Sequence, residues 1–212
     1  MNPVVYSDAN QLIVNDFENR PAVDQIGSYW GEDEVAPVRK QIKDHYIAEQ
    51  DQRCCYCTFE IATNNNAVWD GEHIISRDAA ARFMFVPENL SISCKDCNLA
   101  KKEKEVRVNP ALKRFPTRSE QYKIVHPHFD NYADHIQWFG KVVKPLTDKG
   151  IETVAMCGLS RYGKKKAGAA KVPIHPAMAQ QIGVLMDPFS DRIDMHVALA
   201  GIKAYLETVP QD

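Results

Sequence analysis

The sequence predicts an α+β fold built around a cysteine-bound metal. Two short strand patterns lie next to two Cys-x-x-Cys pairs, and amphipathic helix patterns precede the first pair and occupy the C-terminal end. Apolar alternation on either side of Gly140 indicates a β-hairpin. An apolar content of 44% and a charged content of 25% are ordinary for globular proteins, which argues against a wholly disordered chain.

The N-terminal half is expected to contain one helix, two strands and a short second helix. Residues 1–35 are acidic, with a strand expected near "PVVYS". Residues 36–50 predict a helix, because acidic residues and a proline mark its start and apolar residues recur every four positions. "AVWDGEHII" (67–75) predicts a strand that contains a turn, and "LSISC" (90–94) predicts a short strand, followed by a charged helix over 97–106.

The C-terminal half is expected to be irregular at first and helical at its end. Residues 109–130 are rich in proline and turn residues, which predicts an irregular connector. "HIQWFGKVVKPL" (135–146) predicts the hairpin. In residues 190–207 apolar positions recur at steps of three and four, which predicts an amphipathic helix. Core packing is the favoured interpretation of that apolar face, ahead of partner binding.

The cysteines predict a structural zinc site. The N-terminus has no export signal and no apolar run is long enough to cross a membrane, so we expect a cytoplasmic protein whose thiols stay reduced. Two Cys-x-x-Cys pairs suit tetrahedral zinc. Cys55 and Cys157 are interpreted as small apolar residues, although Cys55 could replace its neighbour with a less usual spacing. The four predicted ligands are Cys54, Cys57, Cys94 and Cys97.

Chemistry-bearing residues lie between and directly after these pairs, in "WDGEHIISRD", "PENLSISC" and "CKDCNLAK". The ordered set Glu72-His73, Asn89 and Asn98 resembles the zinc-supported HNH (ββα-metal) nucleases. The resemblance implies an HNH nuclease core over residues 36–108, an acidic extension over 1–35, and a connector, hairpin and helices over 109–212 that pack on the core or on a partner.

The resemblance also implies a role for each residue of the set. His73 would be the general base, because a neutral imidazole can take a proton from water near pH 7. Glu72 and Asn98 would bind the catalytic Mg²⁺ or Mn²⁺ through oxygen. Asn89 would tie the loop together and orient His73. The last position is often His in the family, and the amide of Asn98 is a weaker ligand, which favours hard cations. Adjacent strand residues point to opposite faces, so Glu72 and His73 share a site only if the strand ends or twists there.

Basic residues gather in two segments although the net charge is −2. Residues 95–118 hold eight bases against three acids, and residues 161–171 hold five bases and no acid. Such segregation can present a cationic surface to a polyanion, whereas a solvated loop is the equally favoured interpretation of 161–171. The predicted nucleic-acid contacts are Lys101, Lys102, Arg161, Lys164, Lys165 and Lys166.

Downstream segments are similar to a subset of HNH proteins encoded in anti-phage operons. "NPALKRFP", "IVHPHFDNYADHIQW" and "GIETVAMCGLSR" resemble PtuB-type nuclease subunits of Septu and retron-associated systems. The resemblance implies an endonuclease that cuts DNA, or RNA such as tRNA, with a PtuA-type ABC/SMC-like ATPase partner that docks on the helical tail. The alternatives are a non-catalytic zinc-knuckle module that binds nucleic acid or a partner, and a toxin-like nuclease controlled by an inhibitor.

Overall fold

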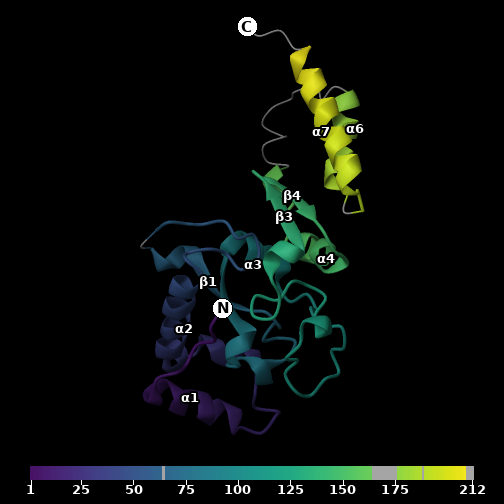
Figure 1. Cartoon of the computed structure of the whole chain (residues 1–212). Helices are drawn as coiled ribbons and strands as arrows, with labels where there is room; N and C mark the ends of the chain where they lie inside the picture. Colours follow the sequence, from purple (N-terminus) through teal and green to yellow (C-terminus); the bar gives the residue numbers. More distant parts are fainter. Residues whose placement is uncertain (64, 164–175, 188, 209–212) are drawn as a thin grey trace.

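The computed structural model describes residues 1–63, 65–163, 176–187 and 189–208 (Figure 1). The fold is α+β, as predicted, with helices around two small antiparallel β-pairs. None of the helices within the described ranges is long and apolar enough to cross a membrane.

Two helices form the N-terminal part. Helix α1 (Asp8–Glu18) begins after Ser7, whose hydroxyl accepts the N–H of Asn10, and α2 spans Ala36–Glu49 as predicted. The strand expected near "PVVYS" is wrong, because residues 1–7 form neither helix nor strand. This segment is held by side chains of α2 instead of a strand partner: the N–H of Val4 donates to the hydroxyl of Tyr46 at 3.1 Å.

The first β-pair leads directly into a helix. Strands β1 (Trp69–His73) and β2 (Leu90–Cys94) are antiparallel, with His73 opposite Leu90. Both strands were predicted, and helix α3 (Lys95–Lys101) follows β2 without a loop. It begins two residues before the predicted range of 97–106 and ends earlier, because Lys102 has a φ of 49° and leaves the helical conformation.

The hairpin and the irregular connector are confirmed. Within residues 109–130 the regular structure is a short 3-10 turn, Ser119–Gln121. Strands β3 (Ile136–Phe139) and β4 (Val142–Pro145) pair through a turn in which Gly140 has a φ of +61°. Helix α4 (Asp148–Met156), capped by the side chain of Thr147, was not predicted.

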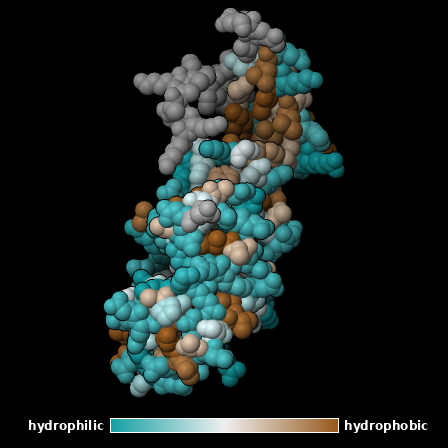
Figure 2. Space-filling view, turned by 90° about the vertical axis from the view of Figure 1, so that its left-hand side faces the viewer, coloured by the Kyte–Doolittle hydropathy of each residue, from teal (hydrophilic) through white to brown (hydrophobic). Residues whose placement is uncertain are grey.

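Two C-terminal helices pack together at one end of the molecule, far from α1 (Figure 1). They are α6 (Pro176–Met186), which also contacts β4, and α7 (Arg192–Glu207), which confirms the predicted amphipathic helix. Figure 2 shows hydrophobic residues on the surface of this helical pair. Core packing, the favoured interpretation of the apolar face of α7, is wrong for the residues that are exposed, which are Ile193, Val197, Leu199 and Leu206.

One cluster of buried apolar side chains joins all three predicted segments of the chain. Phe17 and Tyr29 of the acidic N-terminal segment stack at 4.9 Å, and both contact Phe85 edge-on. Val125 and Leu159 of the C-terminal segment belong to the same cluster. The N-terminal 35 residues are therefore part of the main core and carry side chains to the site described below.

Candidate metal centre and adjoining pocket

Four cysteine sulfur atoms come together as predicted. The Sγ atoms all lie within 4.8 Å of one another and all four residues are buried. A Zn–S bond of about 2.3 Å in tetrahedral geometry puts sulfur atoms about 3.8 Å apart, so the group can hold a metal ion such as zinc. Within the described ranges no other group of three or more His, Cys, Asp or Glu residues is as close. The members are Cys54, Cys57, Cys94 and Cys97.

Burial and the short distances between the four cysteines shift the pKa values of their thiols. Burial raises the pKa of Cys54, whereas a hydrogen bond with Cys54 is the main cause that lowers the pKa of Cys94. The thiolate is the form that binds a metal. Cys55 lies outside the group, and its sulfur accepts a hydrogen bond from Ser91 at 3.3 Å. The tetrad therefore uses Cys54 with the usual Cys-x-x-Cys spacing.

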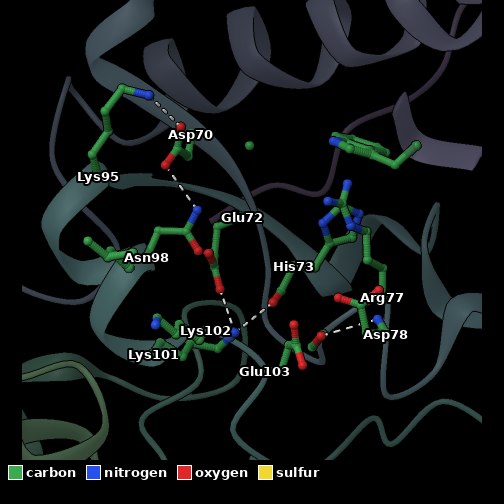
Figure 3. A pocket seen from close by; sticks show the side chains of 14 residues that line it. Asp70, Glu72, His73, Arg77, Asp78, Lys95, Asn98, Lys101, Lys102 and Glu103 are labelled. Carbon is green, nitrogen blue, oxygen red and sulfur yellow. Dashed lines mark hydrogen bonds and ion pairs between the residues drawn. The ribbon is translucent and has the colours of Figure 1, made fainter. Parts of the chain in front are cut away.

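A pocket of about 650 Å³ adjoins this centre between β1 and α3 (Figure 3). The pocket is lined by Glu72, His73 and Asn98 of the predicted HNH set, whereas Asn89 does not line it. Four bases and four acids face it, so its overall charge is balanced. Its lining consists of Trp30, Asp70, Gly71, Glu72, His73, Ser76, Arg77, Asp78, Lys95, Asn98, Leu99, Lys101, Lys102 and Glu103.

Glu72 lies in a buried ion pair. Its Oε1 atom is 2.6 Å from Nζ of Lys101 and accepts the hydroxyl of Tyr56 at 2.9 Å, and both charged side chains are at most 2% exposed. Lys101 also donates to the carbonyl of His73 at 2.9 Å. The prediction that Lys101 touches nucleic acid is wrong, because it lies four residues after Cys97 on the buried face of α3.

The imidazole of His73 lies on the other side of β1 from the Glu72 carboxylate, toward Arg77 (Figure 3). The strand stays regular through both residues, so they alternate and do not converge as the sequence interpretation required. Both still face the pocket, which extends past the end of β1.

The His73 ring is held in one neutral form. Its Nε2 atom lies 3.1 Å from the carbonyl of Met84, which cannot donate, so Nε2 carries the proton. Burial, together with the charges of Arg77 and Lys101, lowers its pKa to about 3. Among the described residues the ring forms its hydrogen bond through Nε2, and Nδ1 forms none. The indole of Trp30 contacts the ring edge-on at 4.4 Å.

Asn98 pairs with an acid that the sequence interpretation missed. Its Nδ2 atom donates to Asp70 at 3.0 Å, and the other Asp70 oxygen accepts from Lys95 at 2.9 Å. Asp70 and Glu72 are two residues apart on β1 and share a face. The Asp70 side chain is 29% exposed, whereas that of Glu72 is 2% exposed. Side chains alternate between the two faces of a strand, so the pattern "WDGEH" could have identified Asp70 as a neighbour of Glu72.

Asn89 binds backbone groups behind the pocket. Its side chain accepts the N–H of Ile75 at 2.7 Å and donates to the carbonyls of Ile75 and Phe83 at 3.1 and 3.0 Å. The residue is completely buried. It fastens the loop between β1 and β2 on the side from which Met84 contacts His73.

The predicted basic contacts have different outcomes. Lys102 lies at the pocket, exposed to solvent. The prediction that Arg161 contacts nucleic acid is wrong, because its guanidinium is turned toward the cysteine group and donates to the sulfur of Cys97 at 3.1 Å. The predictions for Lys164, Lys165 and Lys166 fall outside the described residues.

Two further residues at the pocket were not predicted. Trp30 comes from a 3-10 turn (Gly27–Gly31) in the acidic N-terminal segment, and Arg77 follows β1. Neither has a local sequence pattern that marks it, and Trp30 reaches the pocket only because the N-terminal segment packs against it.

Comparison with protein families, curated proteins and solved structures finds no match to this chain.

Proposed function

We propose that this protein is a metal-dependent endonuclease of the HNH type, which hydrolyses phosphodiester bonds beside a structural zinc held by the four cysteines. The observation that carries the proposal is the pocket, where a neutral histidine with an unpartnered Nδ1, oxygen-bearing side chains and basic side chains meet next to the cysteine group. The order of β1, β2 and α3 around that group is the order expected for a ββα-metal core.

In this proposal His73 is the general base. Its Nε2–H is bound to Met84, so the Nδ1 lone pair is available to take a proton from an attacking water. A pKa of about 3 makes the free ring a weak base. A bound phosphodiester brings negative charge next to the ring, which raises this pKa and strengthens the base.

Oxygen atoms on the other side of the pocket suit a hard divalent cation. Bound Mg²⁺ or Mn²⁺ would stabilise charge on the phosphate and on the leaving oxygen. We assign its binding to Asp70 and Asn98, in place of the predicted pair Glu72 and Asn98. The Glu72 carboxylate is buried against Lys101, whereas the Asp70 side chain is 29% exposed and its ion-pair partner Lys95 is 62% exposed. Glu72 then holds α3 against β1, while Lys95 and Lys102 contact the substrate backbone.

The partner proposal is supported by a different surface. The apolar side chains of α7 that face solvent, among them Ile193 and Val197, form a candidate docking surface for an ABC/SMC-like ATPase subunit. A neighbouring gene for such an ATPase, and co-purification that is lost on Ile193→Asp together with Val197→Asp, would support an anti-phage role. Retention of the partner by this variant would refute the surface.

One observation favours the non-catalytic zinc module as the second candidate. The His73 ring and the Glu72 carboxylate lie on opposite sides of β1, and Glu72 is occupied by Lys101. A protein that only binds would need neither group at a scissile bond. In that case function in cells would survive His73→Ala and Asn98→Ala, whereas Cys94→Ala would abolish it by unfolding the cysteine centre.

The test is a cleavage assay on the full-length protein with Mg²⁺ or Mn²⁺, using plasmid DNA, single-stranded DNA and tRNA. Asp70→Asn and Asn98→Ala should each reduce cleavage at least about 100-fold, since each removes a proposed cation ligand. Asn131→Ala, at an exposed asparagine whose partner is Asp134, is the matched control and should cut like wild type. Undiminished cleavage by Asp70→Asn and Asn98→Ala would refute the ligand assignment.

A further inference from the structure

Two residues from the segment after α4 contact the cysteine sulfurs. Nη2 of Arg161 lies 3.1 Å from Sγ of Cys97 and 4.0 Å from Sγ of Cys94. The hydroxyl of Tyr162 lies 3.4 Å from Sγ of Cys57 and 3.8 Å from Sγ of Cys94. Three of the four sulfurs thus have a partner from a segment more than 60 residues away in sequence.

The hydrogen bonds between these groups have a defined direction. Nη2 of Arg161 lies 2.8 Å from the hydroxyl oxygen of Tyr162. A guanidinium only donates, so this oxygen accepts, and the single hydroxyl hydrogen of Tyr162 is free to point at a sulfur. Cys57, at 3.4 Å, is the nearer of the two. The guanidinium and the phenol therefore both donate toward the cysteine group.

Local structure fixes the Arg161 side chain in this position. Helix α4 ends in a Schellman motif, in which Leu159 N–H binds the carbonyl of Val154 and Gly158 has a φ of +62°. Nη1 of Arg161 donates to the carbonyls of Cys157 and Gly158 at 2.7 and 2.9 Å, which holds the guanidinium across the turn.

Packing fixes Tyr162 from the other side. Its ring meets Phe59 edge-on at 4.6 Å and Trp138 at 5.9 Å. Phe59 follows the first cysteine pair by two residues, and Trp138 lies on β3. Tyr162 is thus held between the first cysteine loop and the hairpin, with its hydroxyl directed at the sulfurs.

These contacts offset the negative charge that a metal-bound group of four thiolates would carry. Four thiolates around Zn²⁺ leave an excess of about two negative charges. Buried charge is unfavourable unless it is paired and hydrogen-bonded. The four cysteines are at most 7% exposed, so water can offset little of this charge. The Arg161 cation and the Tyr162 hydroxyl supply donors where solvent cannot.

We propose that Arg161 and Tyr162 are positioning residues of the metal centre, which stabilise the zinc-bound thiolates and fasten the segment after α4 to the cysteine group. Zinc affinity then depends on this segment, and the docking of this segment depends on zinc. The proposal is independent of nuclease activity, because it concerns only the cysteine centre and its neighbours.

The experiment measures zinc binding on the full-length protein by competition with a chromogenic chelator. Outer hydrogen-bond partners of metal ligands typically contribute about 10- to 100-fold in metal affinity. Arg161→Met should weaken zinc binding within that range, and Tyr162→Phe should weaken it less, since it removes one hydroxyl. Arg192→Met removes the same charge from an exposed position on α7 and should bind zinc like wild type.

A second readout separates this role from simple loss of fold. In the Co²⁺-substituted protein the sulfur-to-cobalt charge-transfer band should shift in Tyr162→Phe and Arg161→Lys, because fewer or altered donors reach the thiolates. Wild-type zinc affinity in Arg161→Met, or an unchanged cobalt spectrum in Tyr162→Phe, would overturn the proposal. So would a wild-type protein that binds neither metal.

Discussion

Glu72 and Lys101 form a buried ion pair whose charged atoms lie 2.6 Å apart, with both side chains at most 2% exposed. Through it β1 is joined to α3, and the hydroxyl of Tyr56 adds the first cysteine loop to the same carboxylate. Lys101 also binds the carbonyl of His73. This pair therefore connects the cysteine centre to the histidine at the pocket.

Loss of one partner should destabilise the protein strongly. Lys101→Met leaves the Glu72 carboxylate buried without a counter-charge, which should lower the free energy of unfolding by about 3–5 kcal/mol in urea denaturation. Lys102→Met, at the adjacent exposed lysine, is the matched control and should change it by less than about 0.5 kcal/mol. The double variant Glu72→Gln with Lys101→Met should recover part of the loss, and equal stability of the two single lysine variants would contradict the account.

Stability should depend on pH through His73. Its pKa is lowered to about 3 in the folded protein, mainly by burial, against about 6.5 when unfolded. Between these values only the unfolded chain binds the proton, so folding weakens as pH falls from about 6.5. Above pH 6.5 both states are neutral and the effect disappears.

The measurement compares wild type with His73→Gln, because His126 and His128 also have lowered pKa values through burial and contribute to the total slope. The difference in unfolding free energy, wild type minus variant, should fall by about 1.4 kcal/mol per pH unit between pH 6 and 4. A difference that is independent of pH would mean that the His73 ring takes up a proton as readily in the folded protein as in the unfolded chain, which would contradict the prediction.

Asn89 should be needed for the loop behind the pocket. Asn89→Ala removes the partners of three buried backbone groups, of Ile75 and Phe83, and each unpaired group costs about 1–3 kcal/mol. We expect a loss of at least about 3 kcal/mol in chemical denaturation. Asn131→Ala, which is exposed, should stay within about 0.5 kcal/mol. A loss below about 1 kcal/mol for Asn89→Ala would contradict the role given to its side chain.

Metal removal should expose a defined set of thiols. The chain has six cysteines, and four of them form the group that could hold a metal ion. A strong chelator should therefore increase the number of thiols that react rapidly with a disulfide reagent by four, and should loosen α3 and the first cysteine loop in hydrogen exchange. Excess zinc should reverse both changes. Fast reaction of all four before chelation would show that no metal protects them.

The parts of this molecule that were predictable are those determined by local spacing. The cysteine group follows from two Cys-x-x-Cys pairs, and the turn of the second hairpin follows from Gly140 between alternating apolar residues. Helix α1 was missed because Val14 and Phe17 are nearly its only buried apolar residues within an acidic segment.

The site was harder to predict because its details depend on tertiary contacts. Lysine is rarely buried, so Lys101 was expected at the surface, although its spacing from Cys97 places both on one helix face. Arg161 lies in a basic segment and was expected to contact nucleic acid, whereas the turn after α4 directs it to the cysteines. Trp30 reaches His73 only because the N-terminal segment packs into the main core.

The most direct test of the catalytic account is the cleavage rate of His73→Gln at pH 7.5 with Mn²⁺, measured on protein with the same zinc content as wild type. A general base contributes about 10²- to 10⁴-fold to a rate. The account predicts a loss within that range with nucleic-acid binding retained. Cleavage within about twofold of the wild-type rate would contradict it and leave the cysteine centre as part of a binding module.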